Sequence, residues 1–420
     1  MSAAATPRVL RFDEARDWVL AAATPLPAIE LPLARCAGRA LRRRMIAPHA
    51  LPPFRNSAMD GWAVRVADLA GASVAAPVAL PVAGVVAAGV GEGAALPPGC
   101  AVRIMTGAPL PEGADAVVPF EQGEDAAGGA RVRVGVAPAP GEHVREAGAD
   151  VAAGALVLEA GRSLSAHDIA LLAALGVAEV AVGPPPRVAI LSTGDELLEL
   201  GEPLRPGAIR DSNRTMLALL VAEAGGEVSI AERVPDDPAR LATRVDDALA
   251  LADVVVTIGG VSAGDFDPVK QALASLDGVE LWRVEMRPGR PQAFGRPSGR
   301  LFFGLPGNPA SVACVFEAMV RPALRRLQGH AALERPRAPV RLARHLASRA
   351  GRTDLVRCTL EWRDGELWAS PAGEQISGHL LPQSRAHALV LVPEAAAELC
   401  EGDTAEAWVL RMPEGTTAGR

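Results

Sequence analysis

Between residues 187 and 327, short apolar strand patterns alternate with helix patterns, and this alternation constrains the fold more than any other feature. Strand-like runs "RVAILS", "EVSIAERV", "DVVVTIGG", "LWRVEM" and "RLFFGL" are separated by helix-like stretches, and a long helix pattern runs from Pro309 to about Leu327. Crossover helices between strands pack back onto the sheet and make neighbouring strands parallel. We therefore predict an α/β domain with a doubly wound, mostly parallel sheet over residues 183–331.

The sequence outside this domain predicts three further units in a multidomain chain. Residues 48–145 are rich in Gly, Pro, Val and Ala with short alternating runs, which predicts an inserted β-rich domain. The insert divides a discontinuous helical, dimerisation domain into residues 1–47 and 146–182, with helix patterns at 12–23 and 165–175. Short strand patterns over residues 332–420 predict a C-terminal small β-barrel.

Composition excludes several classes of function. The formal net charge is −7, and no concentrated basic face is visible, which argues against a nucleic-acid partner. No apolar run approaches the roughly 18 residues that span a bilayer, so we expect no membrane partner. The first residues show no pattern of an export signal. The 5 cysteines are scattered without C-x-x-C or histidine spacing, so we interpret them as reduced core thiols.

Four polar loops follow predicted strands of the α/β domain. They are "STGDE" (192–196), "VPDD" (234–237), "GGVSAGDFD" (259–267) and "LPGNPAS" (305–311). Ligands of open α/β sheets bind beyond the carboxyl ends of the strands, so we expect these loops to form one site. Gly259, Gly260 and Gly264 would let the backbone approach an anion. Guanidinium forks at a strand end would bind an oxyanion in two-point contacts, and the candidates are Arg283, Arg287 and Arg290.

Three carboxylates in the same loops would repel a bare anion. They are Glu196, Asp236 and Asp267. A hard cation removes this conflict, because Mg²⁺ is held by one or two carboxylates together with substrate phosphate and water. The sequence therefore predicts a Mg²⁺ site that bridges these acids to a phosphate.

Simpler structural explanations exist for each of these residues. Asp267 before Pro268, and Asp236 or Asp237 before Pro238, fit helix N-caps followed by proline at the first helical position. Thr193 or Asp195 would likewise cap a helix whose dipole Glu196 complements, and the three arginines would be solvated charges. Two motifs outside the sheet, Asp60-Gly61 and Thr106-Gly107, fit ordinary turns.

Seven motifs in order resemble one known family. They are "NSAMDGWAV", "IMTGAPLPEGADAVVPFE", "ILSTGDEL", "IRDSNRTML", "TIGGVSAGDFD", "MRPGRPQAFG" and "LPGNPASV". With them, essentially the whole chain resembles the molybdopterin molybdenumtransferases, the family of bacterial MoeA and the E-domain of gephyrin. The resemblance implies a cytoplasmic enzyme of molybdenum cofactor biosynthesis that inserts molybdate into adenylylated molybdopterin, with Mg²⁺, and releases AMP.

The resemblance also implies an elongated homodimer with a composite active site, in which Asp60 and Thr106 of the β-rich insert reach the α/β domain of the other subunit. Transient contacts with molybdopterin adenylyltransferase and with molybdoenzyme maturation factors would follow. The implied catalytic residues are Asp60, Thr106, Glu196, Asp236 and Asp267, and the last three would bind the metal. The implied ligand-binding residues are Thr193, Gly194, Gly259, Gly260, Ser262, Gly264, Arg283, Arg287, Arg290, Pro306, Gly307, Asn308 and Pro309.

Two departures from the family pattern affect these assignments. The family commonly has lysines in a "KPGKP" stretch where this chain has Arg287 and Arg290, which keeps the charge and changes the geometry of contact. The stretch 377–393 has His387-Ala388 where the family has an Asn-Gly turn. The rival interpretations are a molybdopterin adenylyltransferase, which has a similar α/β domain, and a non-catalytic scaffold of the same family.

Overall fold

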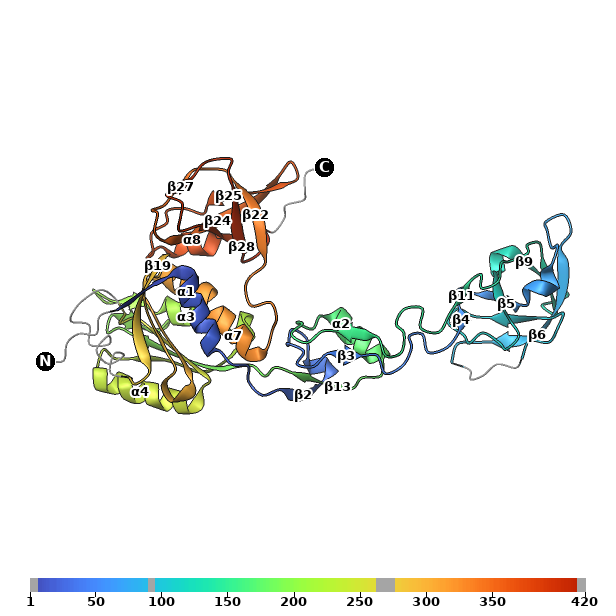
Figure 1. Cartoon of the computed structure of the whole chain (residues 1–420), viewed down its shortest axis with the longest axis horizontal. Helices are drawn as coiled ribbons and strands as arrows, with labels where there is room; N and C mark the ends of the chain where they lie inside the picture. The colour runs from blue at the N-terminus through green and yellow to red at the C-terminus, as the bar shows by residue number, and fades with distance from the viewer. Residues whose placement is uncertain (1–6, 90–94, 262–275, 414–420) are drawn as a thin grey trace.

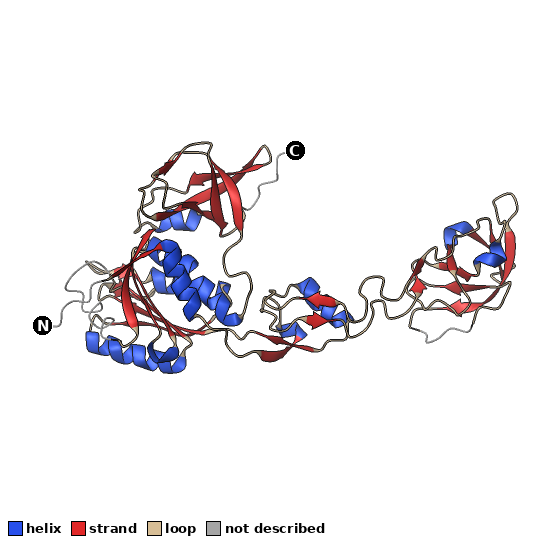
Figure 2. Ribbon diagram, viewed as in Figure 1, coloured by secondary structure: helices blue, strands red, loops and turns tan. Residues whose placement is uncertain are grey.

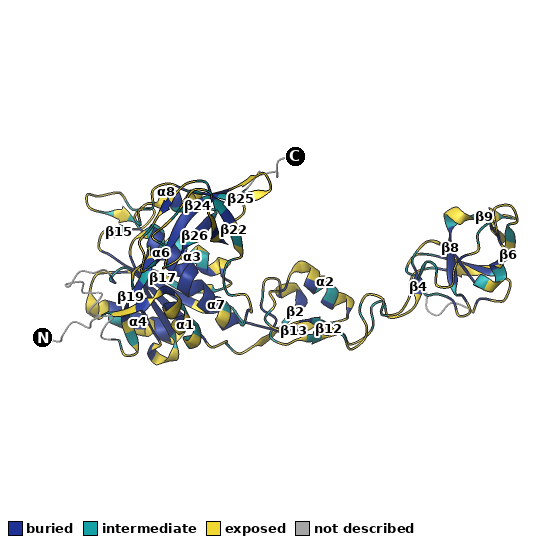
Figure 3. Cartoon of the chain, turned by 45° about the horizontal axis from the view of Figure 1, so that its top comes forward, coloured by how far each residue is buried: buried dark blue, intermediate teal, exposed yellow. Residues whose placement is uncertain are grey.

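The structure is a computed structural model, and it describes residues 7–89, 95–261 and 276–413. The chain is elongated (Figure 1), with the α/β unit and the C-terminal unit at one end, a small unit in the middle and a six-stranded sheet at the far end. Buried residues gather inside each unit, and the two segments that join the middle unit to the far sheet are largely exposed (Figure 3). Among the described residues, no helix combines the length and apolar character that crossing a membrane requires.

A large sheet forms the centre of the α/β unit. Its strands run in the order β17–β14–β18–β21–β20–β19, and β1 pairs with the other edge of β19. The bounds are β1 Arg8–Arg11, β14 Arg187–Thr193, β17 Glu227–Val234, β18 Val254–Ile258, β19 Val279–Arg287, β20 Pro291–Gly295 and β21 Leu301–Leu305. Only β20 is antiparallel to its neighbours, so the predicted mostly parallel sheet is confirmed.

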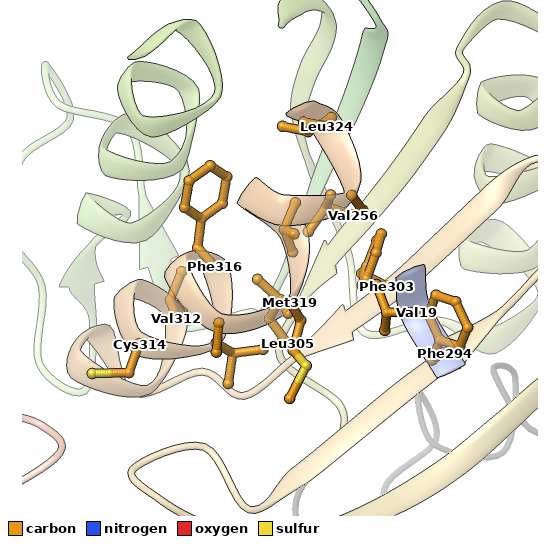
Figure 4. Close-up of a cluster of buried hydrophobic side chains, with 14 of the residues drawn as sticks. Val19, Val256, Phe294, Phe303, Leu305, Val312, Cys314, Phe316, Met319 and Leu324 are labelled. Atoms are coloured by element: carbon orange, nitrogen blue, oxygen red, sulfur yellow. The ribbon is translucent and has the colours of Figure 1, made fainter. Parts of the chain in front are cut away.

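Helices cover both faces of this sheet (Figure 2). One long helix consists of α6 (Pro309–Val315), a π-helical stretch (Phe316–Val320) and α7 (Arg321–Gln328). Ile190 and Val256 face a core that they share with this long helix, with α1 (Phe12–Ala22) and with α3 (Ser212–Glu223). Figure 4 shows part of this core. Their chain neighbours Leu191 and Val255 face α4 (Pro238–Leu251) instead. Neighbouring residues of each strand are thus buried on opposite faces of the sheet, which confirms the doubly wound arrangement.

The structure places residues 8–22 differently from the predicted grouping. β1 pairs in parallel with β19, and α1 packs on the large sheet, so this segment belongs to the α/β unit and not to the discontinuous unit. The middle unit is also less helical than expected. Apart from a short 3-10 turn (Leu33–Arg35), its described elements are α2 (Ala166–Ala174) and two small sheets, β2 (Ile29–Pro32) with β13 (Glu179–Val182) and β3 (Met45–Ile46) with β12 (Leu156–Leu158).

The inserted segment, for which the sequence predicts a β-rich unit, forms a six-stranded sheet. The strand order is β8–β5–β7–β6–β10–β9. The bounds are β5 Gly61–Val64, β6 Val78–Val86, β7 Ala101–Ile104, β8 Ala116–Pro119, β9 Gly123–Ala126 and β10 Arg131–Val134, with β4 Asn56–Ser57 pairing β11 Val144–Arg145 at its base. Trp62 and Phe120 pack edge to face in its core, with ring centroids 4.7 Å apart.

The C-terminal unit is a closed five-stranded barrel, as predicted. Its strands pair in the order β24–β25–β22–β28–β26 and return to β24. The bounds are β22 Arg337–Leu342, β24 Thr353–Arg363, β25 Glu366–Pro371, β26 Ala388–Val392 and β28 Thr404–Val409, and α8 covers Leu380–Arg385. Because β24 also pairs with β19 at Met286 and Arg287, the barrel is joined directly to the large sheet.

A buried histidine at the end of α7 makes the fold sensitive to acid. His330 is 6% exposed, and neither of its ring nitrogens has a hydrogen-bond partner among the described residues. Burial first, and then the charges of Arg325 and Arg321, lower the pKa of His330 from 6.5 to about 4. The folded chain therefore stays unprotonated at His330 between these pH values, where the unfolded chain binds a proton.

We expect this difference to reduce the free energy of unfolding as the pH falls from 6.5 towards 4. The loss through His330 at pH 5 should be about 2 kcal/mol. His330→Leu removes no hydrogen bond of the ring, so it should match the wild type at pH 8 and exceed it at pH 5. Urea unfolding at both pH values measures this, with His49→Leu at an exposed position as the control. Equal pH dependence in wild type and His330→Leu would contradict the burial of a neutral ring.

Candidate active site

The candidate site lies where the course of the chain through the large sheet reverses. From β14 the chain moves outward to β17, and β18 then lies on the other side of β14, so the strand order reverses at β14. Such a switch point leaves a crevice at the carboxyl ends of the strands. A cavity of about 750 Å³ occupies this position. It is lined by Thr193, Gly194, Glu196, Leu197, Ile209, Arg210, Asp211, Ser212, Asn213, Asp236, Ile258, Gly259, Gly260, Gly307, Asn308, Pro309, Gly378 and Leu380.

Two glycines allow the loops after β14 and β18 to approach each other. Gly259 has φ +99°, and a Cβ atom there would lie 2.7 Å from Thr193 Oγ1. Gly194 has φ +147°, and a Cβ atom there would lie 2.6 Å from the Glu196 carboxylate. The Thr193 hydroxyl donates to Ile258 O at 3.2 Å and ties the ends of both strands together. Side chains at either glycine would displace Glu196 or separate the loops.

Glu196 lines the cavity and is not part of a helix. The chain after Gly194 makes a turn and enters β15 (Leu197–Leu198), which pairs with β16 (Ile209–Arg210). No helix begins at residues 193–196, so the alternative in which Thr193 or Asp195 caps a helix is wrong. The carboxylate of Glu196 is therefore available to the cavity.

The structure separates the roles of the two adjacent acids before Pro238. Asp237 is the N-cap of α4, and its Oδ1 accepts a hydrogen bond from Arg240 N at 2.9 Å. Asp236 lines the cavity instead, and its Oδ2 accepts from Asp195 N at 3.3 Å. The Asp236 amide donates to Asp195 Oδ1 at 3.4 Å, which fixes the two loops against each other. The capping interpretation thus holds for Asp237, and Asp236 remains a candidate ligand.

Glu196 and Asp236 provide the oxygen donors that Mg²⁺ prefers, on two loops that border one cavity. Within the described ranges, no cluster of three or more metal-binding side chains exists. Two carboxylates nevertheless fit a Mg²⁺ ion that takes its other ligands from phosphate and water. Three predicted site residues, Ser262, Gly264 and Asp267, lie outside the described residues.

A second cavity of about 490 Å³ adjoins the first and is basic. Three predicted residues line both cavities: Gly260, Gly307 and Asn308. Three others line only the second cavity: Arg287, Arg290 and Pro306. Arg290 forms a two-pronged contact with Glu285 at 2.5 and 2.7 Å, so part of its charge is neutralised. Among the described residues, Arg287 is the less neutralised cation, because its nearest ion-pair partner there, Asp354, lies at 4.0 Å.

Arg283 does not join the other two arginines. It lies four residues before Arg287 on β19, about 13 Å away at the usual rise of a strand. It is exposed and lines neither cavity. Its position in the "WRVEMR" pattern could not distinguish it from Arg287, because both fall on the same side of the strand.

The barrel contributes residues that the sequence did not single out. Arg352, Gln375 and Ser377 line the basic cavity. Ser377 contacts the "LPGNPAS" loop directly, because its carbonyl accepts from Ala310 N at 3.0 Å and its hydroxyl accepts from Asn308 Nδ2 at 3.0 Å. Ser377 lies in the stretch that the family resemblance marked, whereas no local signal indicated Arg352.

Asn213 on α3 is a further residue that sequence reasoning missed. Its side-chain amide donates to Gly307 O at 2.6 Å and connects the start of α3 to the same loop. It lies in the "IRDSNRTML" motif, from which no site residue was predicted. Asp211 is the N-cap of α3, and its Oδ1 accepts from Arg214 N at 3.1 Å. In the 377–393 stretch, His387 Nδ1 accepts from Leu360 N at 3.0 Å, which gives that histidine a structural role in the barrel.

Asp60 and Thr106 lie together, but far from this cleft in the same chain. Asp60 Oδ1 accepts from Thr106 N at 2.6 Å and from Thr106 Oγ1 at 2.8 Å. These hydrogen bonds from the Thr106 amide and hydroxyl hold the pKa of Asp60 below its usual value. Both residues are exposed on the six-stranded sheet at the opposite end of the elongated chain (Figure 1).

Fold and cleft together define a class of protein: an α/β unit with an acidic and a basic cavity at its switch point, joined to a barrel and carrying a β-rich insert on a long arm. Three family models match this arrangement: the MoeA N-terminal region (domain I and II) at residues 10–176, a probable molybdopterin binding domain at 189–326, and the MoeA C-terminal region (domain IV) at 339–410. The chain belongs to the MoeA family of molybdopterin molybdenumtransferases.

Individual relatives agree with this family. Molybdopterin molybdenumtransferase 2 of Mycobacterium tuberculosis is 40% identical over 388 residues, covering 91% of this chain and 95% of the relative. A molybdopterin molybdenumtransferase of Nostoc is 40% identical over 368 residues, covering 86% and 84%. The crystal structure of a molybdopterin biosynthesis MoeA protein from Pyrococcus horikosii has a TM-score of 0.81 at 32% identity and covers 96% of this chain and 99% of that one.

Proposed function

We propose that this protein inserts molybdate into adenylylated molybdopterin and releases AMP. The observation that carries the proposal is the pair of adjoining cavities, one lined by Glu196 and Asp236 and the other by Arg287 and Arg290. A pterin linked to AMP by a pyrophosphate needs a cation seat for its phosphates, and molybdate needs a positive site beside it. The names of the relatives support the same reaction.

The residues would act by positioning and by charge. Glu196, Asp236 and Asp267 would hold Mg²⁺, which when bound neutralises the pyrophosphate and polarises its P–O bond. The backbone at Gly259 and Gly260 would lie against a phosphate, and Arg287 would bind molybdate, with Arg290 and Arg352 nearby. Thr193, Gly194, Pro306, Gly307, Asn308 and Pro309 would form the wall that orients the pterin. No covalent intermediate is required of this chain.

The active enzyme would be a homodimer with a composite active site. Asp60 directly precedes β5 and Thr106 follows β7, in the sheet at the opposite end of the elongated chain from the cleft (Figure 1), so a second subunit would bring them to it. An apolar groove of about 720 Å³ borders the cleft, and Ser212 and Leu380 line both. Leu200, Leu219 and Leu380 are exposed there. An exposed apolar surface of this kind beside a site fits burial against a second copy of the chain.

Leu219→Asp is expected to convert the dimer to a monomer. Leu219 is 63% exposed on α3, so a carboxylate there should cost the monomer only the lower helix propensity of Asp, whereas it would suffer a large desolvation penalty in an apolar interface. Analytical ultracentrifugation measures the change. Leu251→Asp is the matched control, because Leu251 is 56% exposed on α4, on the opposite face of the sheet. A dimer that persists in Leu219→Asp would place the interface elsewhere.

The proposal also places the enzyme in the cytoplasm, in transient contact with molybdopterin adenylyltransferase and with maturation factors of molybdoenzymes. Family membership supports these steps, because the substrate arrives adenylylated and the product must reach an acceptor protein.

Reconstitution with purified protein tests the reaction itself. Adenylylated molybdopterin, Mg²⁺ and molybdate should give AMP and pterin-bound molybdenum, and tungstate in place of molybdate measures oxyanion preference. Formation of an AMP adduct from ATP and metal-free molybdopterin would instead indicate the adenylyltransferase. Absence of any binding of adenylylated molybdopterin would favour a scaffold and would contradict the proposal.

A further inference from the structure

The position of the barrel relative to the α/β unit determines the shape of the basic cavity. Arg352, Gln375 and Ser377 of the barrel line this cavity together with Arg287 and Arg290 of the α/β unit. Among the described residues, the polar contacts between the two units at the cavity are few. Ala310 N and the Asn308 amide donate to Ser377, Arg287 lies 4.0 Å from Asp354, and β24 pairs with β19 over two residues. Contacts away from the cavity must therefore help to hold the barrel in place.

Arg16 of α1 lies in the joint between the two units. Its side chain is 12% exposed, and its Nη2 contacts Glu334 in the segment that leads from α7 into the barrel. Its guanidinium lies 5.5 Å from the ring centroid of Trp408 on β28 and 5.6 Å from that of Phe12. Trp408 is 1% exposed and its side chain packs in the core of the α/β unit, so this contact lies where the barrel meets that core.

Arg16 also contacts the helix that begins at the cleft. Its Nε donates to Ala318 O at 3.4 Å, in the π-helical stretch that continues α6. Asn308, Pro309 and Ala310, which border the cleft or contact Ser377, form the start of that same helix. One guanidinium thus contacts the cleft helix, the interdomain segment and the barrel.

We propose that Arg16 is a positioning residue that fixes the barrel loops at the basic cavity relative to the α/β unit. A guanidinium can contact two aromatic rings, a carboxylate and a backbone carbonyl with separate parts of one rigid plane, which the single ammonium of lysine cannot do. Loss of Arg16 would weaken the contact between the barrel and the α/β unit. Arg352 and Ser377 would then spend less time at the distances from Arg287 that let them bind one ligand together. Arg16 itself touches no reacting group.

The inference rests on the proposed function only where it concerns molybdate, so its test combines a structural and a binding measurement. Arg16→Met keeps the length of the stem and removes the charge and the fork. Hydrogen–deuterium exchange at the Ala310 amide, which donates to Ser377, should accelerate about tenfold. The molybdate dissociation constant, from equilibrium dialysis, should rise about tenfold, which corresponds to 1.4 kcal/mol. AMP release at saturating molybdate should change less than about twofold, a split between KM and kcat that a general loss of fold would not produce.

Two further variants make the outcome decisive. Arg8→Met removes a cation whose contacts are Glu280 and Trp18, away from the barrel, and should match the wild type in all three measurements. Arg16→Lys keeps the charge and should fall between wild type and Arg16→Met, which keeps the test valid where Arg16→Met folds poorly. Unchanged Ala310 exchange and molybdate affinity in both Arg16 variants would overturn the inference. A wild type that neither binds molybdate nor releases AMP would overturn the proposed function instead, and Ala310 exchange would still report on Arg16.

Discussion

Asp236→Asn is expected to reduce AMP release from adenylylated molybdopterin roughly 100-fold without changing the fold, because a metal in such a site supplies several kcal/mol of charge stabilisation. An asparagine oxygen can still accept the hydrogen bond from Asp195 N, so the two loops should stay together. What is lost is one of the two carboxylates, Glu196 and Asp236, that are proposed to hold Mg²⁺ and line the cavity. The rate of AMP release should therefore recover partly as the Mg²⁺ concentration is raised.

The neighbouring acid provides the control for this prediction. Asp237 caps α4, and asparagine caps helices as well as aspartate does, so Asp237→Asn should retain wild-type activity and stability. Asp267→Asn, at a position outside the described residues, should keep the fold and lose molybdenum insertion, like Asp236→Asn. Identical Mg²⁺ dependence in Asp236→Asn and wild type would exclude Asp236 as a metal ligand.

Asp60→Asn is expected to cost a similar factor, roughly 100-fold, although the residue lies at the far end of the chain from the cleft. The side-chain oxygen of the introduced asparagine can still accept from the Thr106 amide, so the turn should form normally. The charge, which two hydrogen bonds from Thr106 favour, would be absent from the partner's site. Steady-state AMP release and urea unfolding measure the two effects separately.

Asp125→Asn is the matched control for Asp60→Asn. Asp125 is an exposed acid on β9 of the same sheet, and no hydrogen bond of its side chain is seen among the described residues. This variant should behave as wild type. Full activity in Asp60→Asn would remove the six-stranded sheet from the catalytic site.

The sequence predicts the large sheet well because its strands and helices are long and strongly patterned. β14, β17, β18 and β21 all lie where apolar runs predict them. β1 was not found, because it has only 4 residues, and its partner β19 lies about 270 residues further along the chain. Pairing over such a separation leaves no local pattern.

Positions at the cavity were predictable where a polar loop directly follows a predicted strand, as with Gly194, Glu196 and Gly259. The choice between Asp236 and Asp237 was not predictable, because either carboxylate could cap α4 and only the backbone geometry before Pro238 decides. Arg352 was missed for a different reason. It reaches the basic cavity from the barrel, and its local sequence gives no indication of that contact.

Mixing two inactive variants tests most directly whether two chains share each active site. Asp60→Asn and Asp236→Asn are each expected to be nearly inactive alone. After dissociation and random reassociation of equal amounts, half of the dimers would be mixed, and each would contain one site with both acids intact, which gives about one quarter of wild-type AMP release. Activity that stays at the level of the separate variants after mixing, with mixed dimers verified by mass spectrometry, would contradict the account.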